Sequence, residues 1–289
     1  MTRDPHHDDL GDFLRARRSE LSPDAVGLPA GGARRVAGLR REEVAALAAI
    51  STDYYTRLEQ GRIQASRSVL DSLARALRLD DDQRAYLYEL AARGDRRPTP
   101  RLPRSTAQPQ LQRMLDDMPH TPAFVIGPRT EIVAWNAMGA ALITDFGEIP
   151  AEQRYFIRLL FTNPAMRDLY ADWEGVSRLA IAQVRMHNAN NPGDERLAAL
   201  VRELSGLDGQ FRRWWAAHDV ATRDTGTKHL HHPVVGDLRL DWNAVTWAAE
   251  PDLQIIAWTA EPGTPSHDSL RLLALWAAER SRPTRSPTR

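Results

Sequence analysis

Four side chains between positions 52 and 57 have the chemistry needed to read the base edges of DNA. Arg57 can donate two parallel hydrogen bonds to a guanine, which is the commonest base-specific contact that proteins make. Asp53 can accept a hydrogen bond from a cytosine amino group, or it can instead stabilise the positive N-terminus of a helix. The sequence leaves both roles of Asp53 open. Thr52 and Tyr54 complete the candidate set of base-contacting residues.

A second group of polar residues flanks these positions and has the chemistry needed to bind phosphate. Arginine, serine and glutamine side chains commonly contact the DNA backbone, where they fix the register of a protein without reading sequence. The candidates are Arg40, Arg41, Ser51, Gln60 and Arg62. They predict a phosphate-binding rim around the base-contacting residues.

These side chains can act together only if the segment around them folds as a pair of short helices. Ser51 is suited to cap the second helix and Gly61 to end it, while Ala49 occupies a turn position that often holds glycine. The residues LEQG at 58–61 resemble the LExG sequence that ends the helix-turn-helix of phage-repressor-type domains, the xenobiotic response element family. In a helix-turn-helix, the second helix enters the major groove with its N-terminal residues at the base edges. A helical hairpin with no role in DNA binding is the alternative.

The region 1–93 predicts an all-α, phage-repressor-like helix-turn-helix domain of five helices. Apolar residues recur at helical spacing in five stretches, with a Gly- and Pro-containing loop at about 22–37. In that loop, Arg34 and Arg35 can reach a neighbouring phosphate or can simply be solvated. Residues 94–110 are rich in Pro and Arg and have no apolar period, so they predict a linker.

Local charge favours contact with nucleic acid although the whole chain has no net charge. Residues 34–78 contain nine Arg against five acidic residues, and residues 93–113 contain six Arg against one Asp. Because a phosphate backbone meets the local charge and not the average, both segments can bind it. The same arginines also fit an ordinary solvated surface, so charge supports the motif without establishing its function.

The remaining residues, 111–289, predict an α+β domain. Two strand-like segments, PAFVIG and EIVAWN, come first and are followed by a helical middle at about 137–217. Two more strand-like segments, LRLDWNAVTW and DLQIIAWTAE, precede a closing helix at SHDSLRLLALWAAER. Strands before and after a run of helices predict helices packed against an antiparallel sheet.

Several segments resemble MmyB-like transcription regulators across nearly the whole chain. The stretch ARRVAGLRREEVAALAAISTDYYTRLEQG is similar to the N-terminal domain of that family. The stretches FTNPAMRDLYADWEGVSRLAIAQVR, HPVVGDLRL and WTAEPGTPSHDSLRLL are similar to its ligand-binding domain, in the same order. The resemblance implies a PAS-like domain with a five-stranded antiparallel sheet and an apolar pocket. It also implies fatty acids as the ligand class and a homodimer on DNA.

Large aromatic side chains of the second domain can line the implied pocket, although each also fits an ordinary core. Ligand sites are mostly apolar and contain a few placed polar groups. Arg185 lies in an otherwise apolar helix, where it can meet a carboxylate head group or form an ion pair. The candidate ligand-binding residues are Trp135, Phe161, Tyr170, Trp173, Arg185 and Trp215.

Other chemistries find little support in the sequence. No phosphate-binding glycine loop, nucleophile elbow or HExxH motif is present, so we expect no enzyme activity and no cofactor. His229, His231 and His232 are clustered, but adjacent strand residues point to opposite faces, so we expect no metal site. The chain has no cysteine, no signal-peptide core and no long apolar run, so we expect a cytoplasmic protein without membrane contact.

These observations predict a transcriptional regulator that binds double-stranded DNA as a homodimer at a pseudo-palindromic operator. A small apolar ligand of the second domain would control it through the arginine-rich linker. One alternative is a regulator that acts only through dimerisation, with no small-molecule ligand. Another is an adaptor whose first domain binds a partner protein, and a third is an enzyme that turns over the bound ligand.

Overall fold

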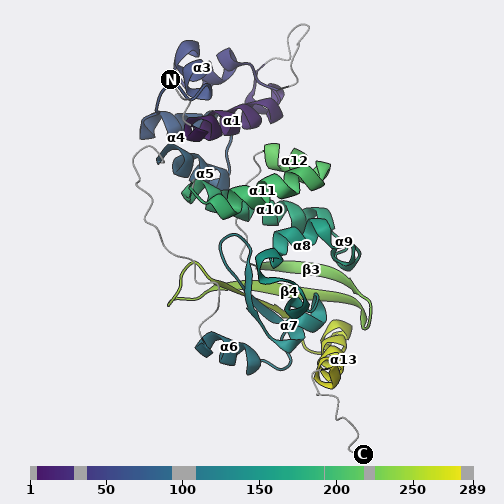
Figure 1. Ribbon diagram of the computed structural model, residues 1–289. Helices are drawn as coiled ribbons and strands as arrows, with labels where there is room; N and C mark the ends of the chain where they lie inside the picture. The colour runs from purple at the N-terminus through teal and green to yellow at the C-terminus, as the bar shows by residue number, and fades with distance from the viewer. Residues whose placement is uncertain (1–4, 29–37, 93–108, 192, 218–224, 281–289) are drawn as a thin grey trace, which may run out of the picture. The chain divides into compact units, whose positions relative to one another are not determined.

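The computed structural model in Figure 1 describes residues 5–28, 38–92, 109–191, 193–217 and 225–280. The chain divides into two compact units, of which the first contains residues 1–99, 185–201 and 209–221. The second contains residues 100–184, 202–208 and 222–289. Arg34, Arg35 and most of the predicted linker lie outside the described residues, and the last two linker positions already belong to a helix.

Five helices form the N-terminal part of the first unit, as the apolar spacing predicted. They are α1 (Pro5–Glu20), α2 (Arg41–Leu47), α3 (Thr52–Glu59), α4 (Arg67–Ala76) and α5 (Asp81–Ala92), with a 3-10 turn at Asp24–Val26. Their apolar faces meet in one core. In it the ring of Phe13 on α1 packs edge-on against Tyr86 of α5, with 5.2 Å between the ring centroids.

Helices α2, α3 and α4 all end in the same hydrogen-bonded turn. Each is followed by a residue in the left-handed backbone region, namely Ala49 (φ 55°), Gly61 (φ 65°) and Arg78 (φ 51°). After α2, the N–H of Ile50 donates to the carbonyl of Ala45 at 3.0 Å, which closes a Schellman turn. The turn between α2 and α3 is therefore the predicted one, with alanine in the place where glycine would have no steric penalty.

Helices α1 and α3 approach each other closely at Gly11. A Cβ atom added there would lie 2.1 Å from the backbone oxygen of Glu59, so the position has no room for a side chain. Because α1 packs in the core, this contact fixes the C-terminal end of α3 against the body of the unit.

The second unit is built on a five-stranded antiparallel sheet with the order β2-β1-β5-β4-β3. The strands are β1 (Ala123–Ile126), β2 (Ile132–Trp135), β3 (Thr225–His232), β4 (Gly236–Thr246) and β5 (Gln254–Thr259). This arrangement confirms the expected α+β domain with an antiparallel sheet.

Helices come before, between and after the strands. They are α6 (Pro109–Asp116), α7 (Ala137–Leu142), α8 (Phe156–Thr162), α9 (Pro164–Leu169), α10 (Trp173–Asn190), α11 (Glu195–Leu207), α12 (Gly209–Ala216) and α13 (Pro265–Arg280). Short 3-10 turns lie at Phe146–Glu148 and Ala151–Gln153. Helix α12 and parts of α10 and α11 group with the first unit. Within the described residues, no helix has the length and apolar content needed to cross a membrane.

The sheet buries apolar residues on both of its faces. Leu111 and Leu115 of α6 pack in one cluster with Ala123 and Val125 of β1. Phe124 lies between those two strand residues and therefore points to the opposite face. There its ring contacts the rings of Phe146, Phe156 and Trp258. The second face is thus an aromatic core beneath the helices that follow β2.

Candidate nucleic-acid interface

Helix α3 begins at a well-formed cap. The hydroxyl of Ser51 accepts a hydrogen bond from the backbone N–H of Tyr54 at 3.1 Å, which satisfies a donor that the first turn would otherwise leave free. Ser51 is thus a structural cap, and its position at the N-terminus of α3 leaves it exposed. Both the cap and the Schellman turn before it determine where the first residues of α3 point.

The two sides of α3 have different environments. Tyr55 and Leu58 are fully buried in the core of the helical unit. Thr52, Asp53 and Arg57 are exposed, in agreement with the helical period that places them away from those anchors. The candidate base-contacting residues therefore lie on the exposed side and at the N-terminal end of α3, which is the end that a recognition helix presents to bases.

Tyr54 lies between these two environments. It is half-buried, and its hydroxyl donates a hydrogen bond to the backbone oxygen of Gln64 at 3.3 Å. Because the hydroxyl of Tyr54 donates this bond, its oxygen can still accept a hydrogen bond. The bond also holds the Tyr54 ring beside the start of α3.

Arg57 and Asp53 interact only weakly with each other. Their closest charged atoms, Nη1 and Oδ2, are 4.0 Å apart, and the two side chains are 52% and 81% exposed. An exposed pair at this separation contributes little to stability because water and salt screen it. The guanidinium of Arg57 is thus available to an external acceptor.

The predicted phosphate-binding residues surround α3. Arg40 caps α2, where its N–H donates to Glu43 Oε2 at 2.7 Å while its side chain remains exposed. Gln60 is half-buried at the end of α3, and Arg62 is exposed directly after it. The charge and exposure of Arg40 and Arg62 suit contacts to a DNA backbone, and the Gln60 amide can donate a hydrogen bond to it.

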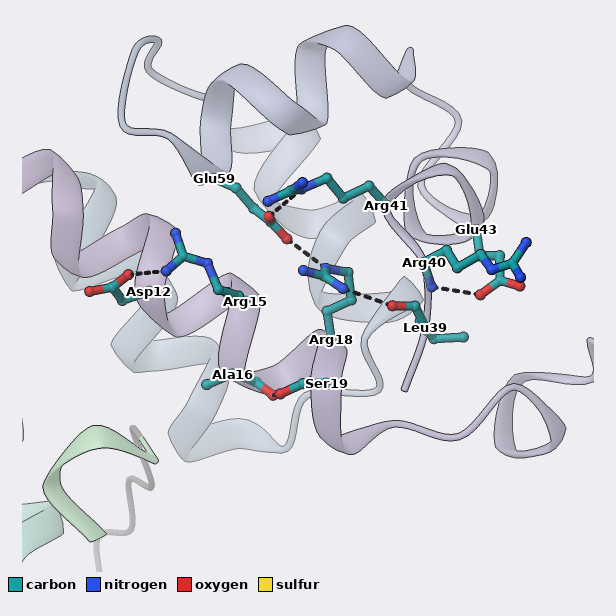
Figure 2. A network of polar contacts seen from close by, with 10 residues as sticks. All are labelled: Asp12, Arg15, Ala16, Arg18, Ser19, Leu39, Arg40, Arg41, Glu43 and Glu59. Carbon is teal, nitrogen blue, oxygen red and sulfur yellow. Dashed lines mark hydrogen bonds and ion pairs between the residues drawn. The ribbon is translucent and has the colours of Figure 1, made fainter. Parts of the chain in front are cut away.

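A buried carboxylate connects α3 to the two helices beside it (Figure 2). Glu59 is 0% exposed in its side chain and accepts from Arg18 Nε of α1 at 2.6 Å and from Arg41 Nε of α2 at 2.7 Å. Arg18 also donates to the carbonyl of Leu39 at 2.8 Å. Burial alone would raise the pKa of Glu59, but the bonds from both arginines outweigh burial and hold that pKa below its usual value.

Arg41 therefore has a structural contact in addition to its predicted one with phosphate. Its side chain is 43% exposed, so the guanidinium is anchored through Nε while part of it faces solvent. No sequence pattern predicts the roles of Glu59 and Arg18. The LEQG ending marked the position of Glu59, but its partners come from helices that are distant in sequence.

The six candidate ligand-binding residues fall into separate groups. Phe161 and Trp173 contact each other edge-on in the second unit, with 5.5 Å between their centroids. Arg185 and Trp215 belong to the first unit, where the guanidinium of buried Arg185 lies 4.3 Å from the ring centroid of Trp215. This cation–π contact gives Arg185 a partner of its own.

Trp135 and Tyr170 lie at different points around the aromatic core of the second unit. The ring of Trp135 contacts Phe146 at 5.6 Å and the guanidinium of Arg154 at 4.7 Å. Tyr170 contacts the ring of Phe156 at 6.5 Å. The Tyr170 hydroxyl is buried without a hydrogen-bond partner among the described residues, and burial raises its pKa. A buried hydroxyl of this kind suits an acceptor group on a ligand.

The second unit also contains a cavity of about 580 Å³, within the size range of ligand pockets. Residues of α7, α9, α13 and the turn between β3 and β4 line it, among them Ala140, His232 and Trp276. None of the six candidate ligand-binding residues lines this cavity. Its lining residues come from segments widely separated in the sequence, so they form no recognisable sequence pattern.

The histidine cluster is divided between the two faces of β3. His229 and His231 are exposed, and Nδ1 of His231 lies 2.7 Å from Oδ1 of Asp237. His232 is buried, and its Nε2 lies 3.0 Å from the carbonyl oxygen of Ala141. Burial lowers the pKa of His232 despite that carbonyl. Across the described residues, no group of three or more His, Cys, Asp or Glu side chains has the arrangement of metal ligands.

Comparison with protein families identifies both parts of the chain. A family model described as the MmyB-like transcription regulator ligand binding domain matches residues 107–273, which is more than half of the 289 residues. A family model described as a helix-turn-helix domain matches residues 9–87. A search of curated proteins finds no match. The chain therefore belongs to the MmyB-like transcription regulators, with a DNA-binding helix-turn-helix domain at 9–87 and a ligand-binding domain at 107–273.

Proposed function

We propose that this regulator binds a pseudo-palindromic DNA operator as a homodimer and responds to a small apolar ligand of the fatty-acid class. The proposal places it in the cytoplasm and gives it no catalytic role. One observation carries the DNA part: α3 buries Tyr55 and Leu58 and exposes Thr52, Asp53 and Arg57 at its N-terminal end.

Base reading and phosphate binding are divided between two sets of residues. Thr52, Asp53, Tyr54 and Arg57 would contact base edges in the major groove, with Arg57 bidentate to a guanine. The surrounding Arg40, Arg41, Ser51, Gln60 and Arg62 would contact phosphates and set the register. Because each neutralised phosphate releases counterions, affinity should fall steeply as the salt concentration rises.

Two copies of α3 related by a two-fold axis would read two half-sites about one helical turn apart, roughly 10 base pairs between centres. The spacing of the half-sites follows from the symmetry of the dimer. A selection from random duplexes therefore tests the proposal: we expect an enriched inverted repeat with that spacing. Enrichment of a single half-site would contradict the dimeric part, and the absence of any enriched sequence would contradict specific recognition.

The ligand can regulate binding only if its affinity differs between the DNA-competent and DNA-incompetent arrangements. Two locations are open to it. One is the aromatic region that contains Trp135, Phe161, Tyr170 and Trp173, and the other is the cavity beside Ala140. Arg185 and Trp215 lie in the first unit and belong to neither location, and the Arg185 guanidinium would suit the carboxylate of a fatty acid bound beside them.

Native mass spectrometry of freshly purified protein tests the ligand part. We expect bound mass in the range of a long-chain acid. Ala140→Trp fills the cavity and should remove that mass if the cavity is the site, whereas Tyr170→Phe should weaken binding if the aromatic region is the site. Protein without bound mass, even after incubation with a long-chain acid, would instead favour regulation through dimerisation alone.

A further inference from the structure

Helix α13 exposes two leucines that lie one turn apart on the same face. Leu272 is 59% exposed and Leu275 is 66% exposed. The other large apolar residues that the described part of the chain exposes are single ones, three on different elements, such as Leu207 on α11, and one in the turn between β3 and β4. Isolated exposed leucines are ordinary, but a pair that forms a continuous strip indicates a contact surface.

The opposite face of α13 is already used by the second unit. Leu270, Leu273 and Ala277 are buried, and α13 contacts both α7 and β4, beside which it is drawn in yellow in Figure 1. Trp276 and Ala277 also line the cavity. The strip formed by Leu272 and Leu275 is therefore an outer face of a helix whose inner face is fixed.

Two exposed charges of opposite sign flank Leu275 symmetrically. Arg271 precedes it by four residues and Glu279 follows it by four residues, so each lies about 6 Å from Leu275 along the axis and on the same side of the helix. If two such helices pack antiparallel with Leu275 at the two-fold axis, Arg271 lies level with the partner's Glu279. The same pairing brings Leu272 level with the partner's Ala278. The face is thus complementary to itself in an antiparallel arrangement, as a two-fold interface requires.

We propose that the exposed face of α13 is the self-association surface of this protein, with two α13 helices packed antiparallel about Leu275. The inference rests on the proposed homodimer and names the surface that forms it. Two leucines from each copy fill the centre, and two Arg271–Glu279 ion pairs close the edges. The contact is smaller than a standard stable interface, so the free dimer is weak, and a paired operator strengthens it by holding two copies together.

Sedimentation of the full chain over a concentration series tests the apolar centre. Leu275→Glu places two carboxylates against each other at the axis and should weaken the dimer by about tenfold or more, as expected for a central contact. Leu207→Glu is the matched control, because Leu207 is 65% exposed on a different helix, α11. It should leave the monomer–dimer equilibrium unchanged.

Charge reversal tests the antiparallel pairing itself. Arg271→Glu alone, or Glu279→Arg alone, sets like charges against each other and should weaken the dimer. The double variant Arg271→Glu/Glu279→Arg restores both pairs and should recover the dimer. An equimolar mixture of the two single variants should form heterodimers more readily than either variant forms homodimers.

The outcomes separate this inference from the proposed function. A dimer that survives Leu275→Glu uses another surface, which overturns the inference and leaves a dimeric regulator intact. Single reversals that weaken the dimer without rescue in the double variant overturn the antiparallel pairing. A wild-type protein that stays monomeric, even on a duplex with two half-sites, contradicts both the inference and the dimeric part of the proposed function.

Discussion

At the scale of single residues, Glu59 connects three helices of the helix-turn-helix domain, because its buried carboxylate on α3 binds Arg18 of α1 and Arg41 of α2. Glu59→Gln removes the charge and leaves two guanidinium groups without their counterion. We expect the free energy of unfolding to fall by about 3 kcal/mol, the scale for breaking a buried pair from one side. Asp12→Asn, which breaks the exposed pair with Arg15, should cost well under about 1 kcal/mol. Chemical denaturation measures both, and equal effects would contradict the role assigned to Glu59.

The lowered pKa of Glu59 also predicts how stability depends on pH. As the pH falls, the unfolded chain takes up the proton near the ordinary value of 4.5, before the native state does. The contribution of Glu59 is thus complete above pH 4.5 and is lost as the pH falls through the lowered native pKa. The difference in unfolding free energy between wild type and Glu59→Gln should therefore shrink below that pH. A difference that stays constant down to strongly acidic pH would show that the pKa of Glu59 is the same in the native and unfolded states, which contradicts the lowered native pKa.

Residue-level prediction from the sequence is strongest where local rules decide the outcome. The cap formed by Ser51 and the helix stop at Gly61 follow from their neighbours, so sequence spacing located both. The partners of Glu59 depend on how three helices pack, which local rules do not determine. The cavity beside Ala140 and His232 forms between side chains of separate elements, so no sequence motif predicts it.

At the scale of elements, the turn between α2 and α3 carries a testable strain. Ala49 has φ 55°, where a side chain costs about 1–2 kcal/mol and glycine is free of that cost. We expect Ala49→Gly to raise the free energy of unfolding by up to about 1 kcal/mol, after the greater entropy of glycine in the unfolded chain is counted. Ala46→Gly is the matched control inside α2 and should destabilise by about the same amount. If Ala49→Gly and Ala46→Gly lowered the free energy of unfolding equally, the result would argue against the left-handed turn at Ala49.

The packing of α1 on α3 leads to a second prediction. Gly11→Ala introduces a Cβ atom 2.1 Å from the backbone oxygen of Glu59, so the helices must move apart. We expect a loss of about 1–3 kcal/mol in stability, as for overpacking of a core. Gly206→Ala is the control on α11, where nothing lies within 4 Å of the added atom, and it should be neutral or stabilising. Thermal unfolding compares them, and an unchanged melting temperature for Gly11→Ala would contradict the close approach.

Local sequence predicts some helices and strands better than others. All five N-terminal helices have a regular apolar period and were predicted, as was the closing helix. Strand β3 carries only one aliphatic residue, Leu230, in the segment TGTKHLHH, and its pairing with β4 defines its extent. Helix α6 begins at Pro109, a residue suited to the first helical position, and packs Leu111 and Leu115 against the sheet, whereas composition assigned its first two residues to the linker.

At the scale of the whole molecule, the resemblance to a regulator family and the family matches agree on one helix-turn-helix domain and one ligand-binding domain. The two units of the structure are divided differently along the chain, because residues 185–201 and 209–221 group with the first unit. The linker at 94–110 remains a prediction from composition, and the grouping of segments so distant in sequence depends on packing. The proposed communication between ligand and DNA must therefore be tested on the intact protein.

The central claim is that α3 reads bases through Arg57, and DNA affinity of the Arg57→Ala variant tests it most directly. The duplex is the one selected by wild-type protein, and Arg84→Ala, which removes an exposed arginine of α5, is the matched control. We predict a loss of about 1–3 kcal/mol for Arg57→Ala with relaxed preference at one base pair of each half-site, while Arg84→Ala retains that preference. If Arg57→Ala binds as tightly and as selectively as wild type, α3 does not read DNA through this residue and the account is wrong.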